Sequence, residues 1–157
     1  MIRYLNPASI AAPIGRYTHG VETAPGMRLL HVSGQVGLSP DGKLPKDVAG
    51  QAENVWRNIA AILAEAGMGI GDLVRVNTFL VDAAHVGESR AVRLRHLGEH
   101  RPASTLLVVA ALAAPEYLIE IEALAAAPAR PARRAAKRPA RPAPKRAATP
   151  RRAKRRG

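Results

Sequence analysis

Hydrophobic residues recur along this chain with two periods: every second residue in several short runs, and every third or fourth residue in two longer ones. The most apolar stretch lies at 101–125. Within it, Leu106–Leu112 is almost continuously apolar, which predicts a strand buried on both faces or a buried helical piece. Tyr117–Leu124 alternates, which predicts a strand with two distinct faces. Ala113–Pro115 interrupts the run, so the two parts are predicted to be antiparallel strands joined by a short loop. One face of the second strand carries Tyr117, Ile119 and Ile121, and the other carries Leu118, Glu120 and Glu122.

The N-terminal part of the chain predicts one hairpin. Met1–Pro13 has prolines among small residues and is expected to be irregular. Tyr17–Thr23 and Met27–Val36 each fit a strand, and the turn signal Ala24–Gly26 between them predicts that they pair. Ser33–Gln35 interrupts the second strand. Its central glycine indicates a bulge or the close approach of a ligand or another backbone.

Two helices are predicted in the middle of the chain. Asp47–Ala66 has apolar residues at three- and four-residue spacing, with Asp47 placed to cap its start and Gly67 to end it. Leu73–Val81 alternates and predicts a strand. Ala84–Leu97 predicts a second helix, which the following glycine ends.

The predicted order of elements is β-β-α-β-α-β-β. Such an order favours the α+β class, with one mixed sheet and both helices on one face. The other face of a sheet this rich in Val and Leu must also be covered. Association with further copies of the chain is the simplest cover.

Charge divides the chain into two parts. The whole sequence has 24 Lys and Arg against 12 Asp and Glu. Residues 1–127 hold 11 of these bases and all 12 acids, so they form a nearly neutral domain, while residues 128–157 hold the other 13 bases and no acid. This second part consists almost only of Ala, Pro, Arg and Lys. It cannot bury enough apolar surface to offset the entropy of ordering, so it is predicted to be a disordered tail.

The tail has two open interpretations. A flexible polycation binds DNA or RNA without sequence preference, because it releases counterions from phosphates. Alternatively, the tail is only a solubilising extension. The bases available for phosphate contact include Arg133, Arg134, Lys137, Arg138, Arg151, Arg152, Lys154 and Arg155.

Several classes of protein are disfavoured by what the sequence lacks. The chain has no cysteine, which excludes disulfides, thiolate metal sites and thiol nucleophiles. The N-terminus lacks the apolar core of a secretory signal, and the longest apolar run falls well short of the ~20 residues of a membrane span. We therefore expect a cytoplasmic protein without a membrane partner, associated with the nucleoid if the tail binds DNA.

Candidate chemistry is sparse. Glu120 and Glu122 share one strand face. They are either an acid/base pair at a pocket wall or residues on the solvent-exposed face of an edge strand. His96 and His100 have the spacing of metal ligands on a helix, but no third ligand is near, which favours a solvated helix end and no metal site. The glycine-rich 67–71 follows a helix and not a strand, so it is a cap and a turn, and we expect no cofactor. Ser33–Gln35 and Arg101–Thr105 either present polar groups to a small ligand or are turn chemistry.

Taken together, five sequence features resemble the RidA/YjgF family, the reactive-intermediate enamine/imine deaminases. The resemblance extends from Asn6 to about Ala125. The features are Pro13–Tyr17, Val32–Val36, the helix with Gln51, Asn54 and Asn58, Ala66–Val74, and Arg101–Thr105 followed by Ile119–Ala123.

The resemblance implies a chorismate-mutase-like fold and a homotrimer with its sheets turned inward and three ligand pockets at the subunit interfaces. It also implies that Tyr17, the Ser33–Gly34 backbone and Glu120 line each pocket, with Glu120 positioning the water that attacks a substrate C=N carbon. An arginine directly after Pro-Ala clamps the substrate carboxylate in the family, and here that position is Ser104. Loss of a charge-assisted contact costs about 1.5–3 kcal/mol.

Two hypotheses follow. The first is a RidA-like trimer that binds a small, uncharged imine, enamine or carbonyl-type metabolite and hydrolyses it as a deaminase, with Ser104 helping to orient the ligand. The second is a non-catalytic trimeric scaffold that binds nucleic acid through its basic tails.

Overall fold

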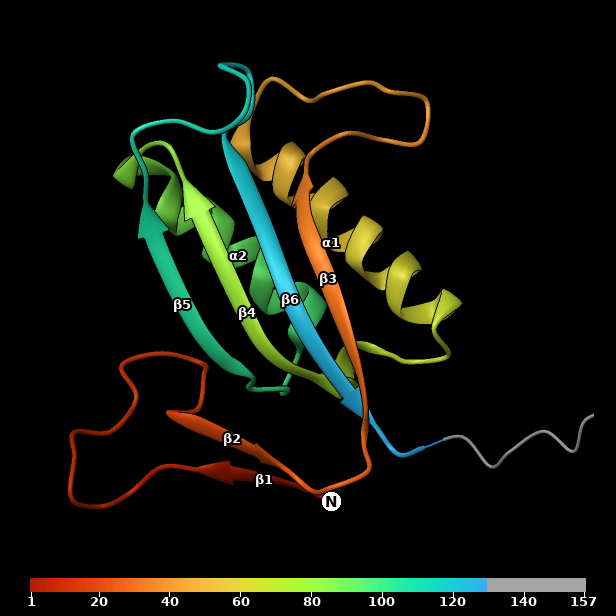
Figure 1. Ribbon diagram of the computed structural model, residues 1–157. Helices are drawn as coiled ribbons and strands as arrows, with labels where there is room; N and C mark the ends of the chain where they lie inside the picture. Colours follow the sequence, from red (N-terminus) through yellow and green to blue (C-terminus); the bar gives the residue numbers. More distant parts are fainter. Residues whose placement is uncertain (130–157) are drawn as a thin grey trace, which may run out of the picture.

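Two helices pack against one face of a four-stranded sheet in the computed structural model, which describes residues 1–129 (Figure 1). The order of strands in this sheet is β3-β6-β4-β5. Its elements are β3 (Arg28–Val36), α1 (Val48–Glu65), β4 (Leu73–Leu80), α2 (Val86–Leu97), β5 (Ala103–Val108) and β6 (Ile119–Ala127). Two short 3₁₀ helices, η1 (Ile70–Asp72) and η2 (Ala83–His85), precede β4 and α2. The predicted tail, with the eight basic residues named for it, lies outside the described residues, so the domain boundary and both interpretations of the tail stay predictions.

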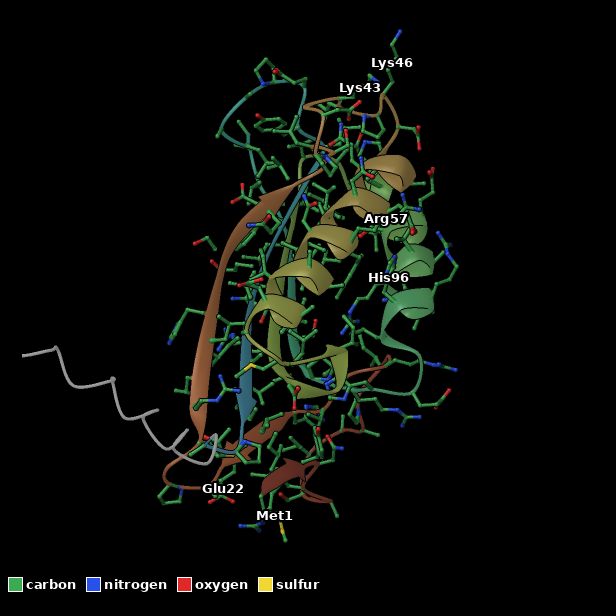
Figure 2. All side chains as sticks on the ribbon, turned by 90° about the vertical axis from the view of Figure 1, so that its right-hand side faces the viewer. Met1, Glu22, Lys43, Lys46, Arg57 and His96 are labelled. Atoms are coloured by element: carbon green, nitrogen blue, oxygen red, sulfur yellow. The ribbon has the colours of Figure 1, made fainter. Side chains whose placement is uncertain are left out.

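The α+β class with both helices on one face of a mixed sheet is confirmed. β4 and β5 run parallel and are joined by the α2 crossover, whereas β6 is antiparallel to both of its neighbours, β3 and β4. Figure 2 shows the two helices on the same side of the sheet. Among the described residues, none of the helices has the length and apolar character needed to cross a membrane.

The helix ends follow the predicted capping. Asp47 caps α1, since its carboxylate accepts a hydrogen bond of 2.8 Å from the Gly50 N–H. Gly67 follows the last turn with φ +63°, and Gly98 follows α2 with φ +54°, conformations that side chains other than glycine rarely adopt. The helices therefore begin and end within two residues of their predicted bounds.

The hydrophobic core lies between the helices and the sheet. Trp56, Ile59 and Leu63 of α1 are fully buried against strand residues such as Leu73 and Ile119. Full burial of a large apolar side chain contributes roughly 1.5–3 kcal/mol, so these residues carry much of the stability.

The N-terminal strands pair differently from the prediction. Residues expected to be irregular include β1 (Ile2–Leu5), which pairs antiparallel with β2 (Gly20–Thr23) in a separate two-stranded sheet. The predicted hairpin between Tyr17–Thr23 and Met27–Val36 is therefore wrong, because β3 pairs along its length with β6. β6 offers β3 a long apolar partner, whereas β2 contains one large aliphatic residue, Val21.

The interpretation of Leu106–Leu112 also needs correction. The strand ends at Val108, and Leu106, Leu107 and Val108 are 40%, 50% and 49% exposed, so this run is not buried on both faces. β5 and β6 are antiparallel but do not pair, because β4 lies between them. The crossover through α2 delivers β5 to the free edge of β4, and the chain then crosses β4 to reach β6.

A buried glutamine joins α1 to the segment that leads into β6. The Gln51 side chain is 1% exposed. Its Nε2 donates to the carbonyls of Pro45 and Glu116, at 2.9 Å each, and its Oε1 accepts from the Leu118 N–H at 2.9 Å. Three backbone groups thus form partly buried hydrogen bonds with one side chain.

We expect Gln51→Leu to lower the free energy of unfolding by about 2–4 kcal/mol, because each unsatisfied buried polar group costs about 1–3 kcal/mol. Gln35→Leu is the matched control. Its amide donates only to carbonyls one and two residues away, so a loss under about 1 kcal/mol is expected. Urea unfolding measures both. Equal losses would contradict the role given to Gln51.

Candidate functional site

The Glu120 carboxylate lies directly over the backbone of Gly34. The register between β3 and β6 shifts between Val32 and Gln35, so Gly34 sits in a bulge. A Cβ atom added at Gly34 would lie 1.7 Å from Oε1 of Glu120. Only glycine permits this approach. The bulge predicted from the Ser33–Gln35 interruption is confirmed, and the group that approaches Gly34 closely is a side chain, where a ligand or another backbone was the predicted alternative.

The two glutamates of β6 have different surroundings. Glu122 accepts a hydrogen bond of 2.7 Å from Asn77 Nδ2, and the Asn77 amide oxygen accepts one from Arg75. This polar chain across β6 and β4 engages the Glu122 carboxylate in a structural contact. Within residues 1–129, no group donates a hydrogen bond to the half-buried carboxylate of Glu120. Of the two, Glu120 is the one free to bind a water or a ligand.

Tyr17 and Ser104 lie on the other side of the sheet. Ser104 pairs with Val76, whose side chain points into the core beneath the helices. Together with residues of α2, Tyr17 and Ser104 line a cavity of about 230 Å³. Glu120, in contrast, pairs with Phe79 on the face that the described helices leave open.

Contacts on both sides of Tyr17 fix its position. Arg16 donates from Nη1 to the carbonyl of Gly98 and to the Glu99 carboxylate, both at 3.1 Å. Thr18 is buried, and its N–H donates to the Pro102 carbonyl at 3.4 Å. A bridge between Thr18 and Ala103 is the contact through which this segment adjoins β5. The segment before β2 is thereby held against the end of α2 and the start of β5.

The sequence-predicted site residues therefore form two groups. Gly34 and Glu120 meet on the open face, and the exposed Ser33 lines a separate hollow of that face with Glu122. Tyr17 and Ser104 meet at the cavity on the helix side. Within one chain the two groups are separated by the sheet.

The two histidines that have the spacing of metal ligands make structural contacts. His96 Nε2 lies 3.2 Å from the Glu53 carboxylate, and its ring stacks on Trp56 at 5.8 Å. A hydrogen bond with His96 lowers the pKa of Glu53, and Arg95 and Arg57 contribute in the same direction. Figure 2 shows His96 and Arg57 on neighbouring helices.

The second histidine of that pair is engaged elsewhere, since Nε2 of His100 lies 2.7 Å from the Leu73 carbonyl. In the part of the chain that the structure describes, no group of three or more His, Asp or Glu side chains is placed to hold a metal ion.

Sequence reasoning missed two arginines of α2. Arg90 and Arg93 both line the cavity beside Ser104. The available signal was the spacing, because Arg93 lies four residues after Ser89, which places both on one face of the helix. Ser89 is buried, so that face points inward.

The fold belongs to a known class of small α+β proteins. Residues 8–127 match the family model described as Endoribonuclease L-PSP. The chain belongs to this family, whose similar members include proteins named RidA, Rid and YjgF.

Individual relatives agree with this placement. Protein HMF1 of Saccharomyces cerevisiae is 33% identical over 130 residues, which cover 80% of this chain and 98% of the yeast protein. The 2-iminobutanoate/2-iminopropanoate deaminase of Escherichia coli K12 is 35% identical over 118 residues, covering 73% of this chain and 89% of that enzyme. The crystal structure of the Rid family protein YyfB from Yersinia pestis superposes with a TM-score of 0.71 at 32% identity, covering 79% of this chain and 97% of that one.

The contact between Gly34 and Glu120 leads us to predict different effects on stability for alanine substitutions at two glycines. Gly34→Ala should leave stability within about 1 kcal/mol, because the end of a flexible carboxylate can move away, but it should displace Glu120 from the bulge. Gly37→Ala is the contrast. Its new Cβ would meet Gln51 Cβ at 2.5 Å and Cα at 2.6 Å, and helix backbone cannot move aside. A loss of about 1–3 kcal/mol is expected there.

Urea unfolding of the two variants and a crystal structure of Gly34→Ala test this prediction. Unfolding of both variants at the same urea concentration would contradict it.

Proposed function

We propose that this protein hydrolyses the C=N bond of a small imine or enamine, with Glu120 holding the attacking water. The observation that carries the proposal is the Glu120 carboxylate, which lies over the Gly34 bulge without a hydrogen-bond donor in residues 1–129. A carboxylate with free lone pairs can accept a proton from water, which makes the water a better nucleophile. The printed name of the Escherichia coli relative, an imine deaminase, supports this chemistry.

The proposed reaction balances without a cofactor. The oxygen of the water forms a bond to the imine carbon while Glu120 takes one proton from the water, and the π electrons of the C=N bond move to the nitrogen. The Glu120 carboxyl gives this proton to the nitrogen, which yields a carbinolamine. Glu120 then moves the hydroxyl proton of the carbinolamine to the amino group, the C–N bond breaks, and ammonia leaves as the carbonyl forms. The cavity of about 230 Å³ beside Tyr17 favours a small metabolite over an RNA chain, the substrate class in the family's description.

We further propose that three copies of the chain assemble and that each pocket forms between two of them. The division of the predicted residues between two faces of the sheet supports this, because Glu120 of one copy can then approach Tyr17 and Ser104 of another. Exposed apolar residues on β5, Leu106 and Leu107, also support it, since association would remove them from water. A trimer with inward-facing sheets is what the family resemblance implies.

Assembly can be tested at β5. We expect the full-length protein to have about three times the 16.7 kDa mass of one chain in sedimentation equilibrium. Leu107→Asp should shift this mass toward that of the single chain, because a carboxylate would be buried without a partner. Ile10→Asp is the control, since Ile10 is equally exposed but lies outside the four-stranded sheet. A wild-type protein that is monomeric in solution would contradict the proposed pocket between subunits.

Hydrolysis is tested with 2-iminobutanoate, by measuring the release of ammonia and 2-oxobutanoate. We expect Glu120→Gln to lower the rate about 100-fold or more, the usual contribution of a general base. Glu122→Gln is the matched control on the same strand face. It should keep most of the activity, because Glu122 is engaged by Asn77. Full activity of Glu120→Gln would exclude the proposed mechanism.

A further inference from the structure

Arg93 is a half-buried cation whose shielded nitrogens lack a partner. Its Nε and Nη2 atoms are screened from solvent, and no group within residues 1–129 accepts a hydrogen bond from either. An unpaired buried guanidinium is costly, because the water it loses is not replaced. A native structure keeps such a group where something outside the described chain pairs with it.

The two unpaired nitrogens define the shape of the missing partner. Nε and Nη2 lie along one edge of the planar guanidinium, and their N–H groups point the same way. This edge matches a carboxylate, whose two oxygens can accept two parallel hydrogen bonds. A single water or carbonyl would satisfy only part of it.

The surroundings of Arg93 form a cationic cavity. Arg90, one helical turn earlier, lines the same cavity, with the hydroxyls of Ser89, Thr78 and Ser104 and the ring of Tyr17. Within residues 1–129 of one chain, no acidic side chain lines it. Burial lowers the pKa of Arg93, and the positive charge of Arg90 lowers it further. An arginine nevertheless stays protonated at neutral pH, so the cavity holds two positive charges.

Arg95 and Arg101, two other arginines close in sequence, form ion pairs elsewhere. Arg95, two residues along α2, pairs with Glu53 at 3.3 Å on the outer side of the helices. Arg101 pairs with Glu99 at 3.5 Å and lines a different cavity, so it does not take the place of an arginine at position 104. Arg93 is the arginine with shielded, unpaired nitrogens beside Ser104.

We propose that Arg93, assisted by Arg90, binds the carboxylate of a short-chain 2-imino or 2-oxo acid in this cavity. Ser104 then leaves room for a cation that comes from α2. In the family pattern, by contrast, the cation comes from the strand, at the position of Ser104. The cavity has the volume of about seven or eight liquid waters at ~30 Å³ each, which suits an acid of a few carbon atoms. The nature of the reacting group rests on the proposed function, but the carboxylate site does not.

The probes for this site are 2-oxobutanoate and its neutral amide, 2-oxobutanamide. Titration calorimetry with the full-length assembly should show the acid binding at least about tenfold more tightly than the amide. The Arg93 Nε–H resonance should shift in ¹H–¹⁵N spectra with the acid only. Equal affinity for the two probes would overturn the proposal.

Substitutions separate the role of Arg93 from that of charge in general. Arg93→Met should weaken binding of the acid about 10- to 100-fold and leave binding of the amide unchanged. Arg93→Lys should be intermediate, because an ammonium keeps the charge but not the two-pronged edge. Arg95→Met removes the same charge from the same helix and should bind both probes as the wild type does.

Stability and mass distinguish a ligand site from a structural one. Arg93→Met should unfold at the same or a higher temperature than the wild type, because it removes an unpaired buried charge. Its mass in sedimentation should stay that of the wild-type assembly. Dissociation of the Arg93→Met assembly would instead assign the guanidinium to a carboxylate of a neighbouring copy, and the proposal would fail.

The proposed carboxylate site and the proposed hydrolytic function can be rejected independently of each other. Glu120→Gln should lose hydrolysis while it retains the preference for 2-oxobutanoate over the amide. Tight, Arg93-dependent binding of the acid without any imine hydrolysis would reject the proposed function alone. Hydrolysis with unchanged acid binding in Arg93→Met would reject the carboxylate site alone.

Discussion

The alternation of β6 is the constraint on which the rest of this structure depends. Ile119 and Ile121 point into the core beneath the helices, so the residues between and beside them must point to the opposite face. One strand thus supplies both the centre of the core and the Glu120 carboxylate. A slip of one residue in its pairing would bury both glutamates, which makes the register of β6 the best-defined feature of the sheet.

That alternation also explains why one chain does not complete a site. Helices cover one face of the sheet, and the cavity with Arg93 and Ser104 belongs to that side, while Glu120 belongs to the other. Backbone groups between the two faces are used in strand pairing and leave no passage. Chemistry that needs both groups of residues requires a second copy of the chain, so the proposed assembly and the proposed hydrolysis share one structural cause.

The sequence predicted what depends on local pattern. The period of α1 and the caps at Asp47 and Gly67 are local, and the structure agrees with them. β1 was missed because a four-residue strand that pairs only with another short strand has little pattern to detect. The exposure of Leu107 was missed because composition identifies apolar residues but not the molecule that covers them. Arg93 was missed because an arginine on a weakly amphipathic helix is typical of a solvated face, and only packing distinguishes it.

The unpaired guanidinium of Arg93 has a thermodynamic consequence for the whole domain. Shielding its Nε and Nη2 atoms from water has a desolvation cost that the rest of the core has to offset. A bound anion removes that cost, so occupancy and folding are linked, and the apparent stability increases with the logarithm of ligand concentration. Because Ser89 and Val92 on the same helix are buried, the cation cannot move away into solvent without loosening α2 from the sheet. If the proposed carboxylate site is occupied, the concentration of its ligand is coupled to the population of the native state.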